Sequence, residues 1–284
     1  PAARDAPANA RDDGAHRWEF HDRLFHMRSR IGFHTAAVGP TFRFADREGP
    51  LPLYKPVASE RHIALTAPSA DTLPTVSLAD ALETRQSRRT YASDPVTRDE
   101  LSTFLFLSCR VKSEVRVADA QPADGPQTAY DWSRRPSPSG GGCHSLEVYL
   151  LIERCQGVDP GVYHYDPEAH RLHVLDAPEG VRRSMLLQAQ YLNGEQAMPD
   201  VLIVLASRFG RMNWKYESMA YATVLKDAGA LLQTLYLACE ATGLAGTAVG
   251  AGSIVDFQRL IGVPVTEESS VAEFLLGRPM ADAE

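Results

Sequence analysis

The 284-residue sequence lacks several features, and each absence argues against a class of protein. No apolar run approaches the length of a membrane span, and residues 1–15 hold no hydrophobic core of a signal peptide. Acidic residues outnumber basic ones, and the resulting net charge of −7 repels phosphate backbones. We therefore expect a cytoplasmic protein that binds neither membranes nor nucleic acid.

Metal-binding and redox-dithiol patterns are absent as well. The four cysteines are Cys109, Cys143, Cys155 and Cys239, and no two of them form a C-x-x-C pair. The nine histidines form no H-E-x-x-H motif, so we expect no metal site. A nucleophilic Cys143–His144 pair is disfavoured, because neighbouring side chains on a strand point to opposite faces.

Composition divides the chain into three parts. Residues 1–15 are rich in Ala, Asp, Arg and Pro and predict a flexible arm. Residues 16–76 form an amino-terminal extension, in which residues 18–30 have helical apolar spacing. Frequent prolines from 39 to 74 predict a connector wrapped over the rest of the chain. Residues 77–284 are expected to form the main domain.

The main domain mixes helical and strand patterns, which predicts an α+β fold. The long segment 218–243 is apolar on most faces, so we expect a helix buried in a core or between subunits, with Leu231 facing outward. The polar stretch 112–136 predicts a long loop. Further helices are expected over 77–85, after the Thr97–Glu100 capping box, and over 181–192 and 253–261; strands are expected over 145–153, 161–165, 171–175, 201–207 and 272–276.

A basic turn occupies residues 85–91. Arg85, Arg88 and Arg89 supply three guanidiniums there, and Ser87 and Thr90 add hydroxyls. Such a group can bind a phosphate through its charge and through bidentate hydrogen bonds. A solvated basic turn would have the same composition, and the spacing alone favours that simpler interpretation.

A glycine-rich segment covers residues 136–142, Pro-Ser-Pro-Ser-Gly-Gly-Gly. Its glycines let the backbone approach a ligand closely. The segment precedes a predicted strand and lacks G-K-[ST], so it is neither a dinucleotide fingerprint nor a P-loop. A plain hinge explains the segment about as well.

Lys215 and Tyr216 are adjacent titratable residues whose free side chains titrate near pH 10. An ammonium group beside a phenol favours the phenolate, which would make Tyr216 a usable base. An exposed lysine beside a half-buried tyrosine is the simpler interpretation of the pair alone.

Taken in this order, the segments resemble the nitroreductase family. Arg85-x-Ser87-x-Arg89 is similar to the R-x-S-x-R turn that opens these flavoproteins, and residues 138–141 resemble their second flavin loop. Residues 225–244 are similar to their long helix, written L-x-D-x-G…Q-x-L…GL.

Two positions depart from the family pattern, with Ala230 where His is common and Thr234 where Asn is common. Both are packing positions, so flavin binding is little affected. The resemblance covers residues 77–279 well and residues 16–76 loosely.

The azoline-oxidising branch of the family carries a Lys-Tyr pair before this helix, and Lys215-Tyr216 matches it. The resemblance implies oxidation of thiazoline or oxazoline rings to azoles in a peptide precursor, ribosomal or carrier-bound. Tyr216 would be the base and Lys215 would lower its pKa, while the reverse assignment stays open. A cyclodehydratase or a nonribosomal peptide synthetase would be the partner. Residues 18–21 and 25–26 also resemble the amino-terminal region of that branch.

The resemblance also implies an architecture: a homodimeric α+β sandwich with a mixed or antiparallel central sheet flanked by helices. One FMN would lie in each of two interface sites. Arg85, Ser87 and Arg89 would bind the phosphate, with Arg278 as a further contact. The ring would lie beside Ser137, Pro138, Ser139, Gly140 and Gly141, and its N5 edge would lie near residues 247–252, which include Val249, Gly250, Ala251 and Gly252.

Two alternatives remain open at this point. One is a nitroreductase or quinone reductase that uses NAD(P)H, against which the Lys-Tyr pair and the extension argue. The other is a non-catalytic scaffold that binds flavin weakly and recruits a cyclodehydratase.

Overall fold

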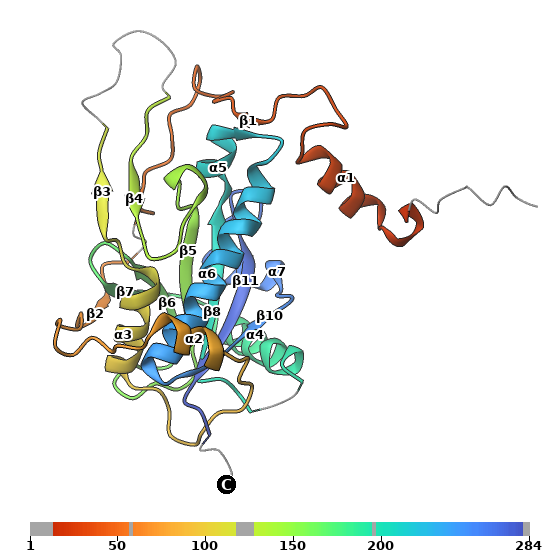
Figure 1. Cartoon of the computed structure of the whole chain (residues 1–284). Helices are drawn as coiled ribbons and strands as arrows, with labels where there is room; N and C mark the ends of the chain where they lie inside the picture. The colour runs from red at the N-terminus through yellow and green to blue at the C-terminus, as the bar shows by residue number, and fades with distance from the viewer. Residues whose placement is uncertain (1–13, 57–58, 118–127, 195–196, 281–284) are drawn as a thin grey trace, which may run out of the picture.

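A seven-stranded antiparallel sheet forms the centre of the computed structural model, which describes residues 14–56, 59–117, 128–194 and 197–280 (Figure 1). Helices cover both faces of the sheet, so the predicted α+β sandwich is confirmed. In spatial order the strands are β10 (Ala245–Val249), β11 (Glu268–Gly277), β8 (Val201–Arg208), β5 (Leu146–Ile152), β6 (Gly161–Asp166), β7 (Arg171–Leu175) and β2 (His62–Ala64).

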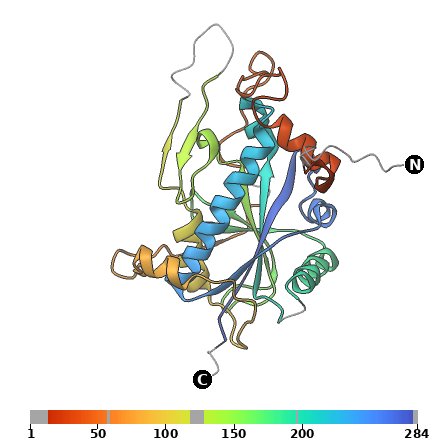
Figure 2. The same ribbon diagram turned by 45° about the vertical axis from the view of Figure 1, so that its right-hand side comes forward.

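Two hydrophobic cores lie on the two faces of this sheet. Leu150 of β5 joins the core beneath α6, whereas its neighbour Leu151 joins the core beneath α4 and α7. Every side chain of β5 is buried, because both faces of the strand are covered. One face carries α2 (Leu78–Thr84), α3 (Arg98–Cys109) and α6 (Ala220–Thr242), with α5 (Phe209–Lys215) beside α6, and the other carries α4 (Glu179–Leu192) and α7 (Ile254–Ile261) (Figure 2).

Side-chain caps begin three of these helices at the residues that the sequence predicts. The hydroxyl oxygens of Ser77 and Ser253 accept hydrogen bonds from backbone amides of the first turn, at 3.0 and 3.1 Å. Thr97 and Glu100 form the predicted capping box. Each cap of this kind stabilises a helix by about 1 kcal/mol.

The remaining elements are short and lie outside the sheet. They are η1 (Ala15–Arg17), α1 (Phe20–Arg28), β1 (Gly39–Pro40), β3 (Ser113–Val115), β4 (Trp132–Arg134), η3 (Gly140–Gly142) and β9 (Tyr216–Glu217). The predicted loop 112–136 contains an antiparallel β3–β4 ribbon, and its residues 118–127 lie outside the described residues. Most of the predicted arm 1–15 also lies outside them.

Helix α6 differs from its prediction in one respect that matters for assembly. Leu231 is only 5% exposed and packs in the core, so the expected outward orientation is wrong. Leu231 lies three and four residues from Ala228 and Leu235, which share the face turned toward the sheet. The exposed apolar residues of α6 are instead Tyr221 and Leu225, at 47% and 39%.

Helix α5 and strand β10 of the main domain were not predicted, nor were the short elements outside the sheet other than α1, nor strand β2; β11 begins at Glu268 rather than Ala272. Strand β2 comes from the amino-terminal extension and pairs with β7, so the central sheet takes its edge strand from that part of the chain. Among the described residues, no helix combines the length and apolar character needed to cross a membrane.

Candidate functional site

Two clusters of polar side chains lie along α6. The amine cluster consists of Tyr130, Gly141, Lys215 and Tyr216, near the amino-terminal half of the helix. The arginine cluster consists of Arg85, Ser87, Tyr236 and Ala248, near the carboxyl-terminal half. Arg89 follows in the same basic turn, and its carbonyl accepts a hydrogen bond from the Asn193 side chain at 3.0 Å. Asp227, which holds the glycine loop, and Tyr236 are nine residues apart, which is about 14 Å along the helix axis.

The Lys215 amine is the centre of the amine cluster. Its Nζ donates a hydrogen bond to the Tyr130 hydroxyl and lies 3.5 Å from the Gly141 carbonyl oxygen. The Tyr130 hydroxyl in turn donates to that carbonyl. The same Nζ lies 4.5 Å from the ring centre of Tyr130 and 5.1 Å from that of Tyr216. The amine is therefore held between two phenol rings.

The glycine loop, residues 137–142, can approach this amine closely because Gly141 has no side chain. Gly141 has φ 62°, and a Cβ there would lie 2.3 Å from Lys215 Nζ and 2.5 Å from the Tyr216 hydroxyl. A Cβ on Gly140 would lie 2.2 Å from a methyl group of Thr223 on α6. Close approach explains both glycines better than a plain hinge does.

Asp227 of α6 holds the glycine loop in place. Its carboxylate accepts hydrogen bonds from the Ser139 hydroxyl at 2.6 Å and from the Gly140 amide at 3.0 Å. The Ser139 oxygen also accepts from the His144 amide at 2.9 Å. Burial raises the pKa of Asp227, although these hydrogen bonds oppose the increase. The acidic residue of the L-x-D-x-G pattern thus links the helix to the loop.

Burial shifts the pKa values of the two candidate bases, Lys215 and Tyr216, in opposite directions. It lowers the pKa of Lys215 and raises the pKa of Tyr216, with the nearby Cys143 and Asp227 adding to the increase. The expectation that Lys215 lowers the pKa of Tyr216 is therefore wrong. The physical reason is that burial penalises both the ammonium and the phenolate. In addition, the amine hydrogen-bonds to Tyr130, a residue that the sequence analysis missed.

The arginine cluster surrounds the hydroxyl of Tyr236. This hydroxyl lies 2.9 Å from that of Ser87 and accepts a hydrogen bond from the Ala248 amide at 2.8 Å. The Arg85 guanidinium lies over the Tyr236 ring at 5.2 Å. Burial alone would raise the pKa of Tyr236, but the two hydrogen bonds and the Arg85 charge lower it overall. Within the described residues, neither Arg85 nor Arg89 forms an ion pair, so both can bind an anion.

The structure does not join the remaining predicted flavin residues to the glycine loop. Val249 pairs with Glu273 of β11, and Gly250, Ala251 and Gly252 follow it at the β10 edge, three strands from β5. No hydrogen bond or ion pair among the described residues connects them to residues 137–142. Arg278 forms an ion pair with Glu100 at 2.7 Å, which neutralises its charge in this chain.

A cleft of about 500 Å³ lies between the β3–β4 ribbon and the glycine loop. Tyr130 and Gly141 line it, so it borders the amine cluster. Ser137, Pro138 and Ser139 also line the cleft, together with Lys112, Trp132, Ser133, Arg134, Arg135, Gly142 and His144.

The rival Cys143–His144 pair is unsuited to nucleophilic catalysis, although for a reason other than the predicted one. The two residues precede β5, and His144 has φ 43°, so the argument from strand geometry does not apply. Burial raises the pKa of the Cys143 thiol and lowers the pKa of His144 to about 3. A buried, protonated thiol is a poor nucleophile.

The amino-terminal extension is hydrogen-bonded to the segment that carries Lys215. Strand β1 pairs with β9, so Pro40 lies opposite Tyr216, and the Phe42 amide donates to the Lys215 carbonyl at 3.2 Å. The Arg211 guanidinium is 4% exposed and donates to the carbonyls of Leu51, Asp131 and Cys143. Three chain segments around the amine cluster are thus tied to α5.

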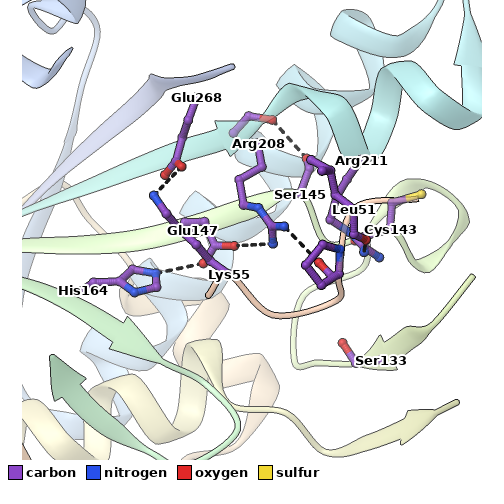
Figure 3. A network of polar contacts seen from close by, with 12 residues as sticks. Leu51, Lys55, Ser133, Cys143, Ser145, Glu147, His164, Arg208, Arg211 and Glu268 are labelled. Atoms are coloured by element: carbon purple, nitrogen blue, oxygen red, sulfur yellow. Dashed lines mark hydrogen bonds and ion pairs between the residues drawn. The ribbon is translucent and has the colours of Figure 1, made fainter. Parts of the chain in front are cut away.

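A second part of the same network anchors the extension further along (Figure 3). Arg208 bonds to Glu147 at 3.1 Å and to the carbonyl of Pro52 at 3.0 Å, while Lys55 pairs with Glu268 at 2.5 Å. The connector predicted to wrap over the rest of the chain is therefore built into the sheet face.

The nitroreductase family model matches residues 82–278, which is more than half of the chain. The chain belongs to the nitroreductase family. The match includes Arg85, the glycine loop, the Lys215-Tyr216 pair and α6.

Three relatives are similar in sequence. A protein described as nitroreductase MJ1384, of Methanocaldococcus jannaschii, is 29% identical over 177 residues, or 62% of this chain and 79% of that protein. Trifolitoxin-processing protein TfxB of Rhizobium leguminosarum bv. trifolii is 26% identical over 49% of this chain and 35% of its own length. Microcin B17-processing protein McbC of Escherichia coli is 29% identical over 39% of this chain and 42% of its own length. The matches to both processing proteins thus span less than half of their lengths.

Two solved structures share the fold. A protein from Anabaena variabilis described as a nitroreductase aligns with TM-score 0.61 and 21% identity, over 91% of this chain and 47% of that one. A chain of the E. coli microcin synthetase McbBCD complex with truncated pro-MccB17 bound aligns with TM-score 0.54 and 16% identity, over 92% of each chain. At these identities the likeness extends to the fold alone.

Proposed function

We propose that this chain is an FMN-dependent dehydrogenase that oxidises azoline rings in a peptide substrate to azoles. The observation that carries the proposal is the contact between the Lys215-Tyr216 pair and the glycine loop at Gly141. It brings a candidate base to the loop that resembles a flavin-binding segment. The similarity to two proteins named for processing trifolitoxin and microcin B17 supports a peptide substrate.

The residues present fit the binding of FMN. The basic turn at residues 85–91 offers the guanidiniums of Arg85 and Arg89, which lack ion-pair partners in the described part of the chain and can therefore pair with a phosphate. The glycine loop offers backbone along the cleft, from Ser137 to Ser139, that can lie against a flat ring. When bound, FMN supplies the acceptor for the two electrons that leave the substrate.

The amine cluster is suited to removing the proton from the azoline Cα. That C–H bond is acidified by the ring C=N and the adjacent carbonyl. The lowered pKa of Lys215 increases the share of free amine near neutral pH, and the amine nitrogen can then take the proton. Tyr130 and the Gly141 carbonyl hold the amine in position, while Tyr216 packs on its other side. We thus favour Lys215 as the base and Tyr216 as its neighbour.

We further propose a homodimer in which the two clusters of each flavin site come from different copies. Within one chain, Asp227, which holds the glycine loop, and Tyr236 of the arginine cluster are separated along α6 by about 14 Å. The outer face of that helix carries the exposed apolar residues Tyr221 and Leu225, and a Cβ on Gly229 would meet no atom within 4 Å. Packing this face on a second copy would bury apolar surface and bring one chain's arginine cluster toward its partner's amine cluster.

The proposal is tested by the mass of the product. The purified chain is incubated with a thiazoline-containing peptide, air and any partner that forms the azoline, such as a cyclodehydratase. We expect the loss of two hydrogens per ring and the release of FMN, rather than FAD, on denaturation. An unchanged peptide mass together with rapid bleaching of the flavin by NAD(P)H would favour the nitroreductase alternative and reject the proposal. A colourless purified protein would favour the alternative of a non-catalytic scaffold that recruits a cyclodehydratase.

A further inference from the structure

The cleft beside the amine cluster has an unusual charge. Lys112 and Arg134 are exposed at its edge and Arg135 lies further in, and no carboxylate is found among the described residues that line it. His144 also lines the cleft, but burial and the charge of Arg135 lower its pKa to about 3, so it stays neutral. The cleft is therefore cationic, although the whole chain carries a net charge of −7.

The carboxylates of the β3–β4 ribbon do not cancel the charges of Lys112 and Arg134. On the β3–β4 ribbon, Arg116 pairs with Glu114 at 3.0 Å and with Asp131 at 3.3 Å. Within the described part of the chain, Lys112 and Arg134 form no ion pair. The Arg134 guanidinium instead lies 5.5 Å from the ring centre of Trp132. Two exposed cations are thus left to interact with whatever enters the cleft.

The cleft also connects directly to the proposed base. Tyr130 and Gly141 are part of its lining, and both contact Lys215 Nζ. Its volume of about 500 Å³ falls within the range of small-ligand sites. The rings of Tyr130 and Trp132 offer apolar surface on which a flat heterocycle can pack.

We infer that the side of this cleft formed by the β3–β4 ribbon, across from the glycine loop proposed to contact the flavin ring, binds the peptide substrate and selects a peptide with a carboxylate beside the ring that is oxidised. Charge complementarity carries the inference: Lys112 and Arg134 would pair with the carboxylate while the ring lies near Tyr130 and Lys215. The inference rests on the proposed function, because it assumes that the amine cluster acts on a peptide-borne ring.

Two synthetic thiazoline peptides test the inference with the full-length, flavin-loaded protein. They are identical except that Asp flanks the ring in one and Asn in the other. Steady-state oxidation gives kcat and KM, and fluorescence anisotropy of dye-labelled peptide gives Kd. We expect a lower KM and Kd for the Asp peptide, an advantage that shrinks as salt screens the charges.

A double variant of the two exposed cations sharpens the test. The Lys112→Ala/Arg134→Ala protein should raise KM for the Asp peptide by roughly 3- to 20-fold, as expected for two exposed charge pairs. Its kcat and its KM for the Asn peptide should stay near those of the unaltered protein. Arg259→Ala removes an exposed cation from α7, across the sheet, and should change neither value.

Two outcomes would overturn the inference. Equal KM and Kd values for the Asp and Asn peptides would show that the cleft does not select charge. Loss of FMN from the double variant would show that these cations hold the cofactor instead. Preferential binding of the Asp peptide without oxidation would support the cleft assignment while rejecting the proposed reaction. Oxidation of both peptides at equal KM would support the proposed reaction and reject the cleft assignment.

Discussion

The two clusters along α6 use tyrosine hydroxyls and backbone groups in a similar way, but they differ in what happens to their positive charge. In the arginine cluster the positive charge is carried by guanidinium, a group that does not lose its proton in proteins. In the amine cluster, burial favours the neutral form of Lys215. The difference indicates that one end of the helix is suited to binding a fixed anion and the other to exchanging a proton.

Removing the charges of Arg85 and Arg89 should abolish the anion binding proposed for their end of α6. The Arg85→Ala/Arg89→Ala variant loses two charge-assisted interactions with the phosphate, each worth roughly 1.5–3 kcal/mol. The Kd for FMN should rise by about 10²-fold or more, so that the protein is purified nearly colourless. Arg88→Ala, in the same turn, is the matched control and should stay yellow. Full flavin retention by the double variant, measured by absorbance, would reject the phosphate assignment.

Replacing Lys215 should abolish the proton transfer proposed for the amine cluster without loss of flavin. Lys215→Ala removes the proposed base, and kcat for azoline oxidation should fall by roughly 10²–10⁴-fold. Flavin content and peptide binding should remain, since the arginine cluster and the cleft cations are intact. The exposed Lys226 provides a matched control, and Lys226→Ala should oxidise at the normal rate.

The pH dependence then separates the two candidate bases. A buried amine loses its proton more readily than a free lysine, whose pKa is about 10.4, so kcat/KM should rise with pH through an apparent pKa below that value. The Tyr216→Phe variant should show the same rise of kcat/KM with pH. A limb above pH 10 that disappears in Tyr216→Phe would identify the phenol as the base, because burial raises the pKa of Tyr216.

A charge on the outer face of α6 should disturb both clusters at once. If the face that carries Leu225 packs on a second copy, Leu225→Asp would bury a carboxylate in an apolar interface and separate the two halves of each flavin site. We expect a monomer by light scattering with little bound FMN. Leu192→Asp is a matched control, because Leu192 is similarly exposed at the end of α4, on the opposite face of the sheet. A monomeric Leu225→Asp protein that stays fully loaded with flavin would contradict the dimeric site.

Local signals in the sequence were sufficient to predict most of the helices and strands and about half of the residues in each cluster. Caps such as Ser77 and Thr97 act within one helical turn, so their residue types alone mark the helix ends. The basic turn at residues 85–91 and the glycine loop are each contiguous in sequence, so both could be recognised by resemblance. The division of the chain at residues 15 and 76 stays a prediction.

The missing parts of the clusters depend on contacts between distant residues. Tyr130 meets Lys215 across 85 positions, and Ser87 meets Tyr236 across 149. No local pattern marks such pairs. The orientation of Leu231 was misjudged because apolar residues surround most of α6, so periodicity alone did not show which side faces the sheet.

The smallest expected effect concerns Tyr130, and it sharpens the view that the amine cluster is a positioned base. The hydroxyl of Tyr130 accepts a hydrogen bond from Lys215 Nζ and donates one to the Gly141 carbonyl. Tyr130→Phe keeps the ring that packs beside the amine but removes both bonds. Losing a hydrogen bond of about 1 kcal/mol from the reacting geometry should lower kcat by roughly 5-fold. The basic limb of the pH profile should also move, because one partner of the amine has changed. Tyr163→Phe, whose hydroxyl bonds to the Asp159 carbonyl, is the matched control. A Tyr130→Phe protein with unchanged kcat and an unchanged pH profile would mean that the hydroxyl does not position the base and that the ring alone suffices.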